Sequence, residues 1–316
     1  MRTIASLSFV LIAGILPGFA ADPQLLNMAM PEATTFGGIN VEQARNSRFG
    51  QFLLSKIEVS PDFQKFIDTT GFDPRRDLRE ILVVATSSDT AGKPPVPTGI
   101  LFLAKGTFDV EQILAAAAKD GHIKASTYAG ASFLTLGGDK HQHAIGLIDG
   151  STVVAGDVAS VRGALDRRTQ ANSVSPALAT RINELSTTQD AWSISNANFS
   201  NFVIPGPEAA GQGSAVLKGV QQASCGVKFG SEIIVNAEAV AKEAADATSL
   251  SDVIRFFAQM IQVQAQGDKV PVEARSVLKN LVVTTEGNVV KVTLSVPEDQ
   301  IESLINSAPH RRSARI

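Results

Sequence analysis

The feature that most constrains this chain is a recurring pair of apolar runs separated by a tight-turn signal. The clearest case is Asp149-Gly150, which lies between the apolar runs Ala144–Ile148 and Ser151–Ala155. This dipeptide between two such runs is the strongest short signal for a β-hairpin. Because the strands of a hairpin pair antiparallel, the chain is expected to fold around antiparallel sheet.

A helical pattern follows these hairpins. The other paired runs are Leu82–Thr86 with Gly99–Ala104, a pair within Val227–Ala239, and a pair within Leu281–Val296. A helix at Asp109–Lys119 follows the first pair, and Pro297 and Glu298 open another after the last. Strands this apolar must be covered on one face. We therefore predict an α+β fold of two antiparallel sheets, each backed by helices and built from repeated ββα units.

The first and last of these units are similar in sequence. Leu78–Val84 and Leu278–Thr284 have matching apolar patterns, and both lead through a second strand into a helix. This similarity indicates an internal duplication, in which residues 81–119 and 281–306 adopt the same unit. The alternative is that hairpin-plus-helix units are common in α+β folds and recur by chance.

The length of the chain, 316 residues, suits two domains of ordinary size or one large domain. We expect a boundary within residues 168–190, which divides the chain into an N-terminal α+β domain at 21–175 and a C-terminal one at 176–316. The basic tail 308–316 is expected to be disordered, as short polar termini commonly are.

Residues 1–20 have the pattern of a secretory signal peptide. Arg2 is positive, Ile4–Leu16 is apolar, and Gly18-Phe19-Ala20 places small residues at the −3 and −1 positions before Ala21. The apolar run is shorter than the roughly 20 residues that span a bilayer, which argues against the alternative of an uncleaved membrane anchor. We expect cleavage near Ala21, export to the periplasm or the exterior, and no transmembrane segment in the mature chain.

Two further segments, Thr70–Leu82 and Leu185–Trp192, stand out beside the signal peptide. Together the three resemble uncharacterised exported bacterial proteins built from duplicated α+β units. The resemblance covers most of the mature chain. It implies an α+β fold and an exported location, and it implies no activity.

Composition argues against several classes of function. The formal net charge is −3 with both signs interspersed, whereas a nucleic-acid-binding protein shows a basic face. One Trp and one Tyr stand against 16 Phe, which favours core packing over stacking on bases or sugars. The sequence contains no Gly-x-Ser-x-Gly or His-Glu-x-x-His motif. We therefore expect a non-catalytic interaction or ligand-binding module, with a protein partner or a second copy of the chain as possible partners.

Cys225 is the single cysteine, so the chain has no intramolecular disulfide. A catalytic thiol requires a partnered histidine, and the sequence nominates none. We interpret Cys225 as a small hydrophobic residue at the start of a strand.

The one cluster of metal-ligand residue types is Asp139, His141 and His143. In an extended segment all three side chains point to one face. Two imidazoles and one carboxylate suit Zn²⁺ with one open position, as in a metal-dependent hydrolase. The alternative is that Gly137–Lys140 forms a turn whose polar residues face water and that the protein has no cofactor.

The segment 250–263 is predicted to be a helix with an unusually wide apolar arc. Two adjoining stripes run along it: Ile254, Phe257 and Ile261, and beside them Val253, Phe256, Met260 and Val263. One stripe is enough to seat a helix on a sheet, so the second is expected to pack inside the protein. The alternatives are a cavity that carries an apolar ligand and a face for a protein partner. Either would use Phe256, Phe257, Met260 and Val263.

Overall fold

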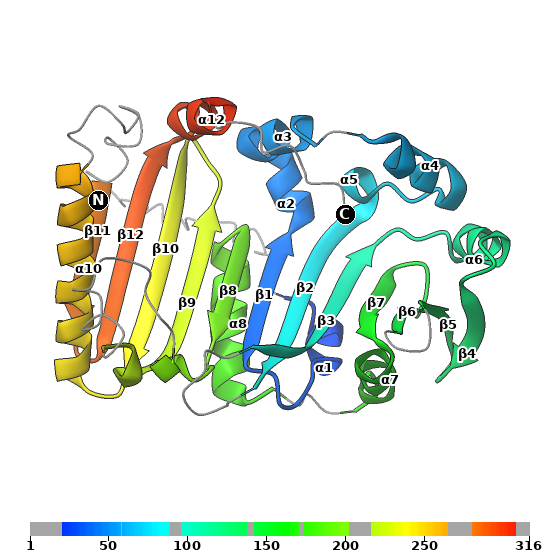
Figure 1. Ribbon diagram of the computed structural model, residues 1–316, viewed down its shortest axis with the longest axis horizontal. Coiled ribbons are helices and arrows are strands. Elements are labelled where there is room, and N and C mark those ends of the chain that lie inside the picture. The colour runs from blue at the N-terminus through cyan, green and yellow to red at the C-terminus, as the bar shows by residue number, and fades with distance from the viewer. Residues whose placement is uncertain are drawn as a thin grey trace, which may run out of the picture.

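The chain folds around one antiparallel sheet in a computed structural model that describes residues 21–57, 59–88, 96–137, 142–170, 174–201, 216–264 and 280–307 (Figure 1). The strands are β1 (Thr35–Asn40), β2 (Leu78–Ser87), β3 (Pro97–Gly106), β4 (Lys124–Tyr128), β5 (Ala131–Leu136), β6 (His143–Leu147), β7 (Thr152–Asp157), β8 (Ala191–Ser195), β9 (Val220–Lys228), β10 (Glu232–Ala241), β11 (Leu281–Glu286) and β12 (Val289–Pro297). Their order is β11-β12-β10-β9-β8-β1-β2-β3-β7-β6-β5-β4.

This single sheet corrects the expectation of two sheets. Strand β1 pairs with β2 on one side and with β8 on the other. Without the second pairing, β1 and β8 would each present an open edge of unpaired backbone groups. The two halves of the chain are therefore joined through backbone hydrogen bonds, which side-chain patterns do not reveal.

The helices are α1 (Pro23–Asn27), α2 (Val41–Asn46), α3 (Arg48–Ser55), α4 (Pro61–Thr70), α5 (Pro74–Asp77), α6 (Val110–Lys119), α7 (Val158–Arg167), α8 (Pro176–Thr188), α10 (Ala244–Gln264) and α12 (Glu298–Ser307), with short 3₁₀ turns at Phe199–Asn201 and Leu217–Gly219. Their ends follow local chemistry. The Ser60 side chain accepts the Phe63 N–H at the start of α4, and Gly71 ends this helix with a φ of 71°. The mixed α+β composition predicted from sequence is confirmed.

The four hairpins predicted from sequence are present as β2–β3, β6–β7, β9–β10 and β11–β12. The repeat between residues 81–119 and 281–306 is not supported, because β2–β3 lies mid-sheet whereas β11–β12 forms one end. The pairing order instead relates two larger sets of five strands each. The run β1-β2-β3-β7-β6 matches β8-β9-β10-β12-β11, and the ten-residue helices α7 and α12 follow β7 and β12 directly.

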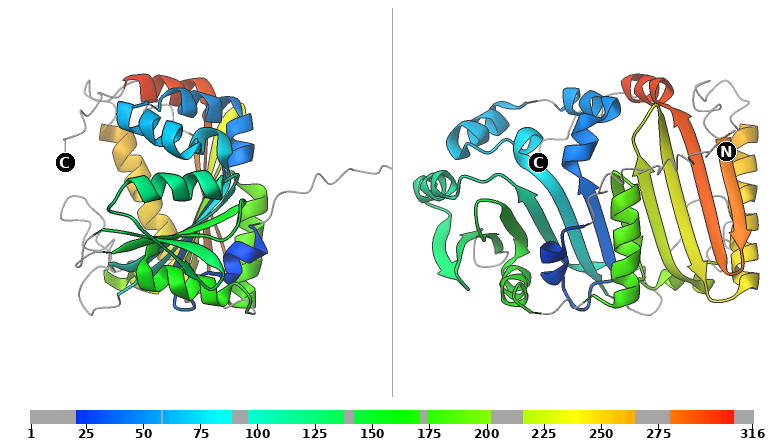
Figure 2. Two further views of the ribbon diagram at one scale, coloured as in Figure 1. Left: turned by 90° about the vertical axis from the view of Figure 1, so that its right-hand side faces the viewer. Right: turned by 180° about the vertical axis from the view of Figure 1, so that it is seen from behind.

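Helices cover the two faces of the sheet differently (Figure 2). On one face, here called the covered face, α8 packs over β1 and β8, α7 packs over β3, β7 and β6, and both contribute with α1 to the main core. On the other face, α10 lies over β10, β11 and β12 at one end, and α6 packs near β4–β7 at the other. Among the described helices none crosses the middle of this second face, which is called the open face below.

The main core lies under the covered face and is continuous across the domain boundary expected at residue 175. Its largest fully buried side chains include Leu25, Met28, Phe36, Leu82, Leu101, Leu103, Phe133, Ile182 and Ile194. Phe36 of β1 and Ile182 of α8 belong to the same buried cluster. The chain segments 21–175 and 176–316 thus share one core.

Helix α10 does not bury its second apolar stripe. Ile254 packs into a cluster with Val290 and Val292, and this seats the helix on the sheet. Phe256 is 54% exposed and Val263 is 67% exposed. The prediction that this stripe packs inside the protein is therefore wrong for Phe256 and Val263, over which the fold places no described element, whereas Val253 and Met260 are partly buried.

Residues 1–20 and 308–316 lie outside the described residues, so the signal peptide and the disordered tail stay predictions. In the described part of the chain, no helix combines the length and the apolar character needed to cross a bilayer.

Candidate functional site

The open face carries a row of small side chains that crosses seven strands. Cross-strand pairing places these residues side by side in the order Phe102, Val83, Gly37, Ser193, Cys225, Ala237 and Val292. Strand side chains alternate between faces, so all seven share the open face. Four neighbouring residues, Gly37 to Ala237, are small, whereas Phe102 and Val83 at one end and Val292 at the other are larger. The row is therefore a trough with raised ends.

A second row of mainly small residues adjoins the first, two residues along each strand. Its order is Ile100, Ala85, Thr35, Ser195, Ala223, Ala239 and Val290. Seven strands have six spacings of about 4.8 Å, so each row is about 29 Å long. The two rows together are called the sheet-face groove.

Two cavities lie along this groove. One, of about 350 Å³, is bounded by Ser195, Ala223, Ala237 and the α10 residue Ile254. The other, of about 340 Å³, is bounded by Gly37, Ile81 and Val83. Ser193 and Cys225 line both cavities, so the two are contiguous. Each volume lies within the range of small-molecule sites.

The groove is apolar and almost free of charge. The one ionisable carboxylate that lines either cavity is Glu238, and its side chain pairs with Arg181 on the covered face. Burial raises the pKa of the Cys225 thiol, so the thiol stays neutral in this setting. At the far end, Phe102 is 50% exposed and Ile100 is 40% exposed. A contiguous exposed apolar surface of this kind marks a binding site more often than a random surface does.

Two glycines of β1 set the depth of the groove. Gly38 faces the covered side, where the Trp192 ring occupies the space beside it: a Cβ on Gly38 would lie 2.5 Å from the ring. Gly37 faces the groove, and a Cβ there would make only ordinary contact, 3.5 Å from the Trp192 backbone oxygen. Sequence reasoning missed this site. Its one signal was a pair of glycines inside a strand, which indicates close approach by another group.

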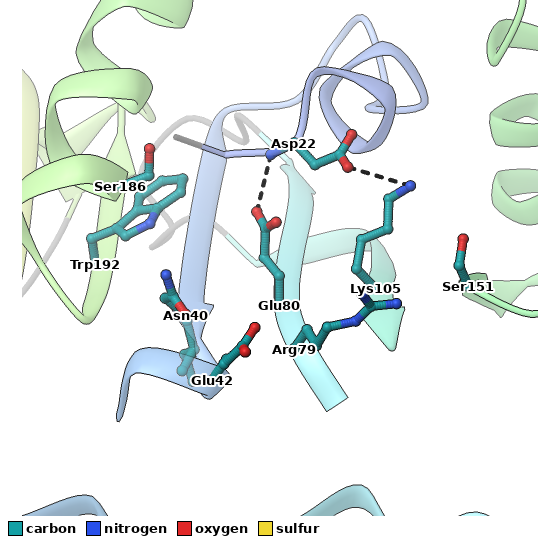
Figure 3. A pocket seen from close by; sticks show the side chains of 10 residues that line it. Asp22, Asn40, Glu42, Arg79, Glu80, Lys105, Ser151, Ser186 and Trp192 are labelled. Atoms are coloured by element: carbon teal, nitrogen blue, oxygen red, sulfur yellow. Dashed lines mark hydrogen bonds and ion pairs between the residues drawn. The ribbon is translucent and has the colours of Figure 1, made fainter. Parts of the chain in front are cut away.

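A second, polar cavity of about 420 Å³ lies beside Asp22, at the start of α1 (Figure 3). Asp22, Glu42, Arg79, Glu80, Lys105, Ser186 and Trp192 are among its lining residues. The Asp22 N–H donates to Glu80 Oε1 at 3.2 Å, and Lys105 Nζ lies 3.3 Å from Asp22 Oδ2. This cavity is called the N-terminal pocket.

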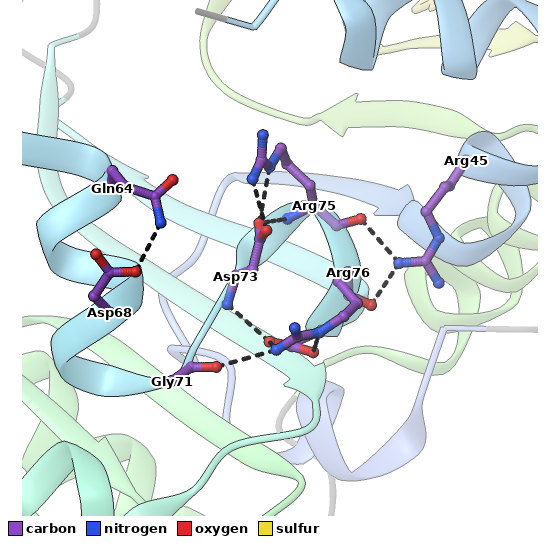
Figure 4. Close-up of polar contacts among 8 residues, drawn as sticks. Arg45, Gln64, Asp68, Gly71, Asp73, Arg75 and Arg76 are labelled. Atoms are coloured by element: carbon purple, nitrogen blue, oxygen red, sulfur yellow. Dashed lines mark hydrogen bonds and ion pairs between the residues drawn. The ribbon is translucent and has the colours of Figure 1, made fainter. Parts of the chain in front are cut away.

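A cluster of charged residues lies between α4 and β2 (Figure 4). Asp73 and Arg75 form an ion pair at 2.7 Å, and Asp77 pairs with Arg76 at 2.6 Å. The hydrogen bond from Arg75 lowers the pKa of Asp73, and the hydrogen bond from Arg76 lowers that of Asp77. Arg45 Nη1 donates to the backbone oxygens of Arg75 and Arg76. These acids and bases form ion pairs with one another, so the role of the cluster is to hold α5 in place.

The predicted zinc ligands are tested only in part. Asp139 and His141 lie outside the described residues. His143 is exposed at the start of β6, opposite Leu136 and Asp157. Within the residues that the structure does describe, no group of three or more His, Cys, Asp or Glu side chains is arranged to hold a metal ion. The zinc site stays a prediction.

The four residues predicted to form an apolar face on α10 differ in their exposure to solvent. Phe256 and Val263 are exposed, whereas Phe257 and Met260 are partly buried. None of these four lines the cavities described above, in which Ile254 is the α10 residue. The structure therefore brings α10 to the groove through the other stripe of the helix.

Comparisons with known proteins identify no family. No family model matches the chain, and no curated protein matches it. Two solved structures of TP0453, its crystal forms IV and I, are similar with TM-scores of 0.49 and 0.48 and 10% sequence identity. They cover 89% and 90% of this chain and 96% and 97% of their own. The chain thus has only distant structural neighbours.

Proposed function

We propose that this protein is an exported, non-catalytic binding protein for a ligand with a long aliphatic chain, and that the chain lies in the sheet-face groove. The observation that supports this most directly is the row Phe102 to Val292, in which four small side chains separate larger apolar ones. The secretory pattern of residues 1–20 supports the exported location.

The shape of the groove favours an aliphatic chain over a protein segment. Its two rows of small side chains are two residues apart on each strand, which is about 7 Å. An α-helix with its side chains is about 10–12 Å across, which is wider than the two rows, so it would have to rest on the residues beside them. The length of about 29 Å suits an extended molecule better than a compact one.

The chemistry of the lining favours the same occupant. Glu238 is the single charged lining residue, and Arg181 already satisfies its carboxylate, so no free charge faces the cavities. An aliphatic chain has no polar group to desolvate, and each methylene removed from water contributes about 0.8 kcal/mol. Thr35, Ser193 and Ser195 are the hydroxyl groups on the floor; Thr35 and Ser195 hydrogen-bond to each other at 2.9 Å, and Ser193 is exposed to solvent.

Fluorescence of Trp192 provides the direct test, because it is the single tryptophan and lies directly beneath the groove: the residue lines one of the two cavities, and its ring packs on the opposite face of the sheet beside Gly38. Purified protein is first stripped of bound lipid and then titrated with a fatty acid that carries bromine atoms on its chain, which quench tryptophan at short range. We expect saturable quenching, and displacement by the same fatty acid without bromine.

Native mass spectrometry of the untreated exported protein provides the second readout and should show an aliphatic adduct. No saturable quenching together with no adduct would overturn the proposal. Quenching that persists unchanged when the groove is filled by substitution would place the ligand elsewhere and would also contradict it.

A further inference from the structure

The expected first residue of the mature chain, Ala21, is buried in the full-length chain. Ala21 is 2% exposed, and its backbone N–H donates to Ser186 Oγ at 2.9 Å. Ser186 is itself 5% exposed and donates onward to the Asn183 carbonyl oxygen. The backbone nitrogen of Ala21 is therefore held inside the fold, at the edge of the N-terminal pocket.

The N-terminal pocket has one unbalanced negative charge. Its ionisable lining residues are three acids, Asp22, Glu42 and Glu80, and two bases, Arg79 and Lys105. Lys105 pairs with Asp22, and Arg79 donates to the Gly106 carbonyl oxygen. Glu80 is partly buried and, among the described residues, has no cation within ion-pair distance.

Glu80 lies next to the point where signal-peptide removal creates a positive charge. One of its oxygens accepts the N–H of Asp22, so its carboxylate is one peptide unit from the Ala21 nitrogen. In the uncleaved chain this nitrogen belongs to an uncharged amide. Burial raises the pKa of Glu80, as does the Asp22 carboxylate, and the Asp22 N–H and Lys105 only partly oppose this effect. The pocket thus disfavours the ionised form of Glu80 unless a cation lies close to it.

We propose that cleavage after Ala20 supplies this cation, and that the α-ammonium of Ala21 stays in the N-terminal pocket, bound by Ser186 Oγ and the Glu80 carboxylate. Hydrolysis of the Ala20–Ala21 amide adds the hydroxyl of water to the Ala20 carbonyl carbon. It leaves an amine on Ala21, which takes up a proton at neutral pH because a free α-amino group has a pKa of about 7.7–8.0. The three N–H donors of the ammonium replace the single donor of the amide.

One consequence is that processing stabilises the fold. The uncleaved chain keeps a desolvated, unpaired carboxylate, whereas the mature chain holds it in an ion pair. An opposite charge close by favours the ionised form of both groups. Burial alone would lower the pKa of this ammonium, so the proposal requires the ion pair with Glu80 to outweigh burial and to raise the pKa, which makes the mature chain the more stable of the two near neutral pH.

The test compares two chains, one that starts at Ala21 and one that starts at Phe19. The second keeps the native sequence but carries its ammonium two residues further out. Each is made with Glu80 and with Glu80→Gln, which retains an acceptor for the Asp22 N–H. Melting temperature at pH 7 is measured for all four, and the α-amino pKa is measured by NMR for the chains that start at Ala21.

We expect Glu80→Gln to lower the melting temperature of the Ala21 chain by several degrees and to leave unchanged or raise that of the Phe19 chain. The α-amino pKa should lie about one unit or more above its ordinary value, and it should fall back in the Glu80→Gln variant. Glu42→Gln, which removes an exposed acid from the same pocket, is the matched control and should shift this pKa far less.

Three outcomes would overturn the proposal. They are an ordinary α-amino pKa that Glu80→Gln does not move, an equal effect of Glu80→Gln in both chains, and an exported protein whose first residue is not Ala21. None of them bears on ligand binding in the sheet-face groove, so the two proposals fail independently.

Discussion

Replacing Ala237 with phenylalanine should fill the middle of the sheet-face groove and block the aliphatic chain. Ala237 lies in the small-residue row on β10, between Cys225 on β9 and Val292 on β12. Its side chain points to the open face and is only partly covered, so a larger side chain has room above the sheet. Phenylalanine is also well suited to a strand. The variant is therefore expected to fold with a melting temperature close to that of the wild type.

The expected loss of affinity follows from the displaced methylenes. A phenyl ring that spans one strand spacing would displace about three methylenes, and at ~0.8 kcal/mol each this removes about 2.4 kcal/mol of burial. Since ~1.4 kcal/mol is a factor of ten, the dissociation constant of the brominated fatty acid should rise about 60-fold.

Ala118→Phe is the matched control, because Ala118 is exposed on α6, and no α6 residue lines the two cavities of the groove. It should leave the dissociation constant within about twofold of wild type, as surface substitutions usually have small effects. An Ala237→Phe protein that is folded and binds the fatty acid as tightly as the wild type would refute the groove as the site.

Four further predictions test the fold. Gly38→Ala should cost about 1–3 kcal/mol of unfolding free energy because its methyl group meets the Trp192 ring, whereas Gly37→Ala on the opposite face should cost less; equal losses in urea denaturation would contradict the packing of Trp192. Asp190→Ala should destabilise by about 1–3 kcal/mol, since Asp190 is 1% exposed, pairs with the partly exposed Lys228 at 3.1 Å and accepts the Phe229 N–H, which the variant leaves without this acceptor; a neutral effect in the same assay would show that these contacts are unimportant. Arg75 and Arg76 lower the pKa values of Asp73 and Asp77 in the folded protein, so the two ion pairs contribute to the free energy of unfolding above the ordinary carboxyl pKa. This contribution is lost as the pH falls through the folded pKa values. Asp73→Asn should therefore reduce the loss of stability at acidic pH, and an unchanged loss would show that the ion pairs do not stabilise α5. Phe256→Ala should cost well under the roughly 3–5 kcal/mol of a buried aromatic because the ring is half exposed, and loss of self-association in ultracentrifugation would identify a partner face on α10.

Local chemistry made much of the secondary structure predictable. The turn Asp149-Gly150 and the flanking apolar runs correspond to β6 and β7, and Ser60-Pro61 begins α4 as predicted. Such signals depend on residues within a few positions of one another. The β4–β5 hairpin was missed, because its first strand is polar and exposed along nearly its whole length and has no apolar pattern to detect.

Long-range pairing was not predictable in the same way. Whether β8 joins β1 or ends a separate sheet depends on backbone hydrogen bonds between residues about 155 positions apart, and these bonds leave no periodic trace in either segment. The expectation of two sheets failed at this point. The prediction for α10 failed for a related reason: an amphipathic pattern shows that a face is apolar but does not show which element covers it.

The sequence by itself determined the local elements: the hairpins, the helix caps and the secretory pattern at the N-terminus, because each depends on neighbouring residues and their intrinsic preferences. Only the tertiary structure decided the candidate sites. Gly37, Ser193, Cys225 and Ala237 come from four different strands and become neighbours through register alone. Likewise, Glu80 accepts the N–H of Asp22 only because β2 and the start of α1 meet at one pocket. Cross-strand register is a property of the assembled sheet, so small residues that look unremarkable along the chain become a groove only once the strands are paired.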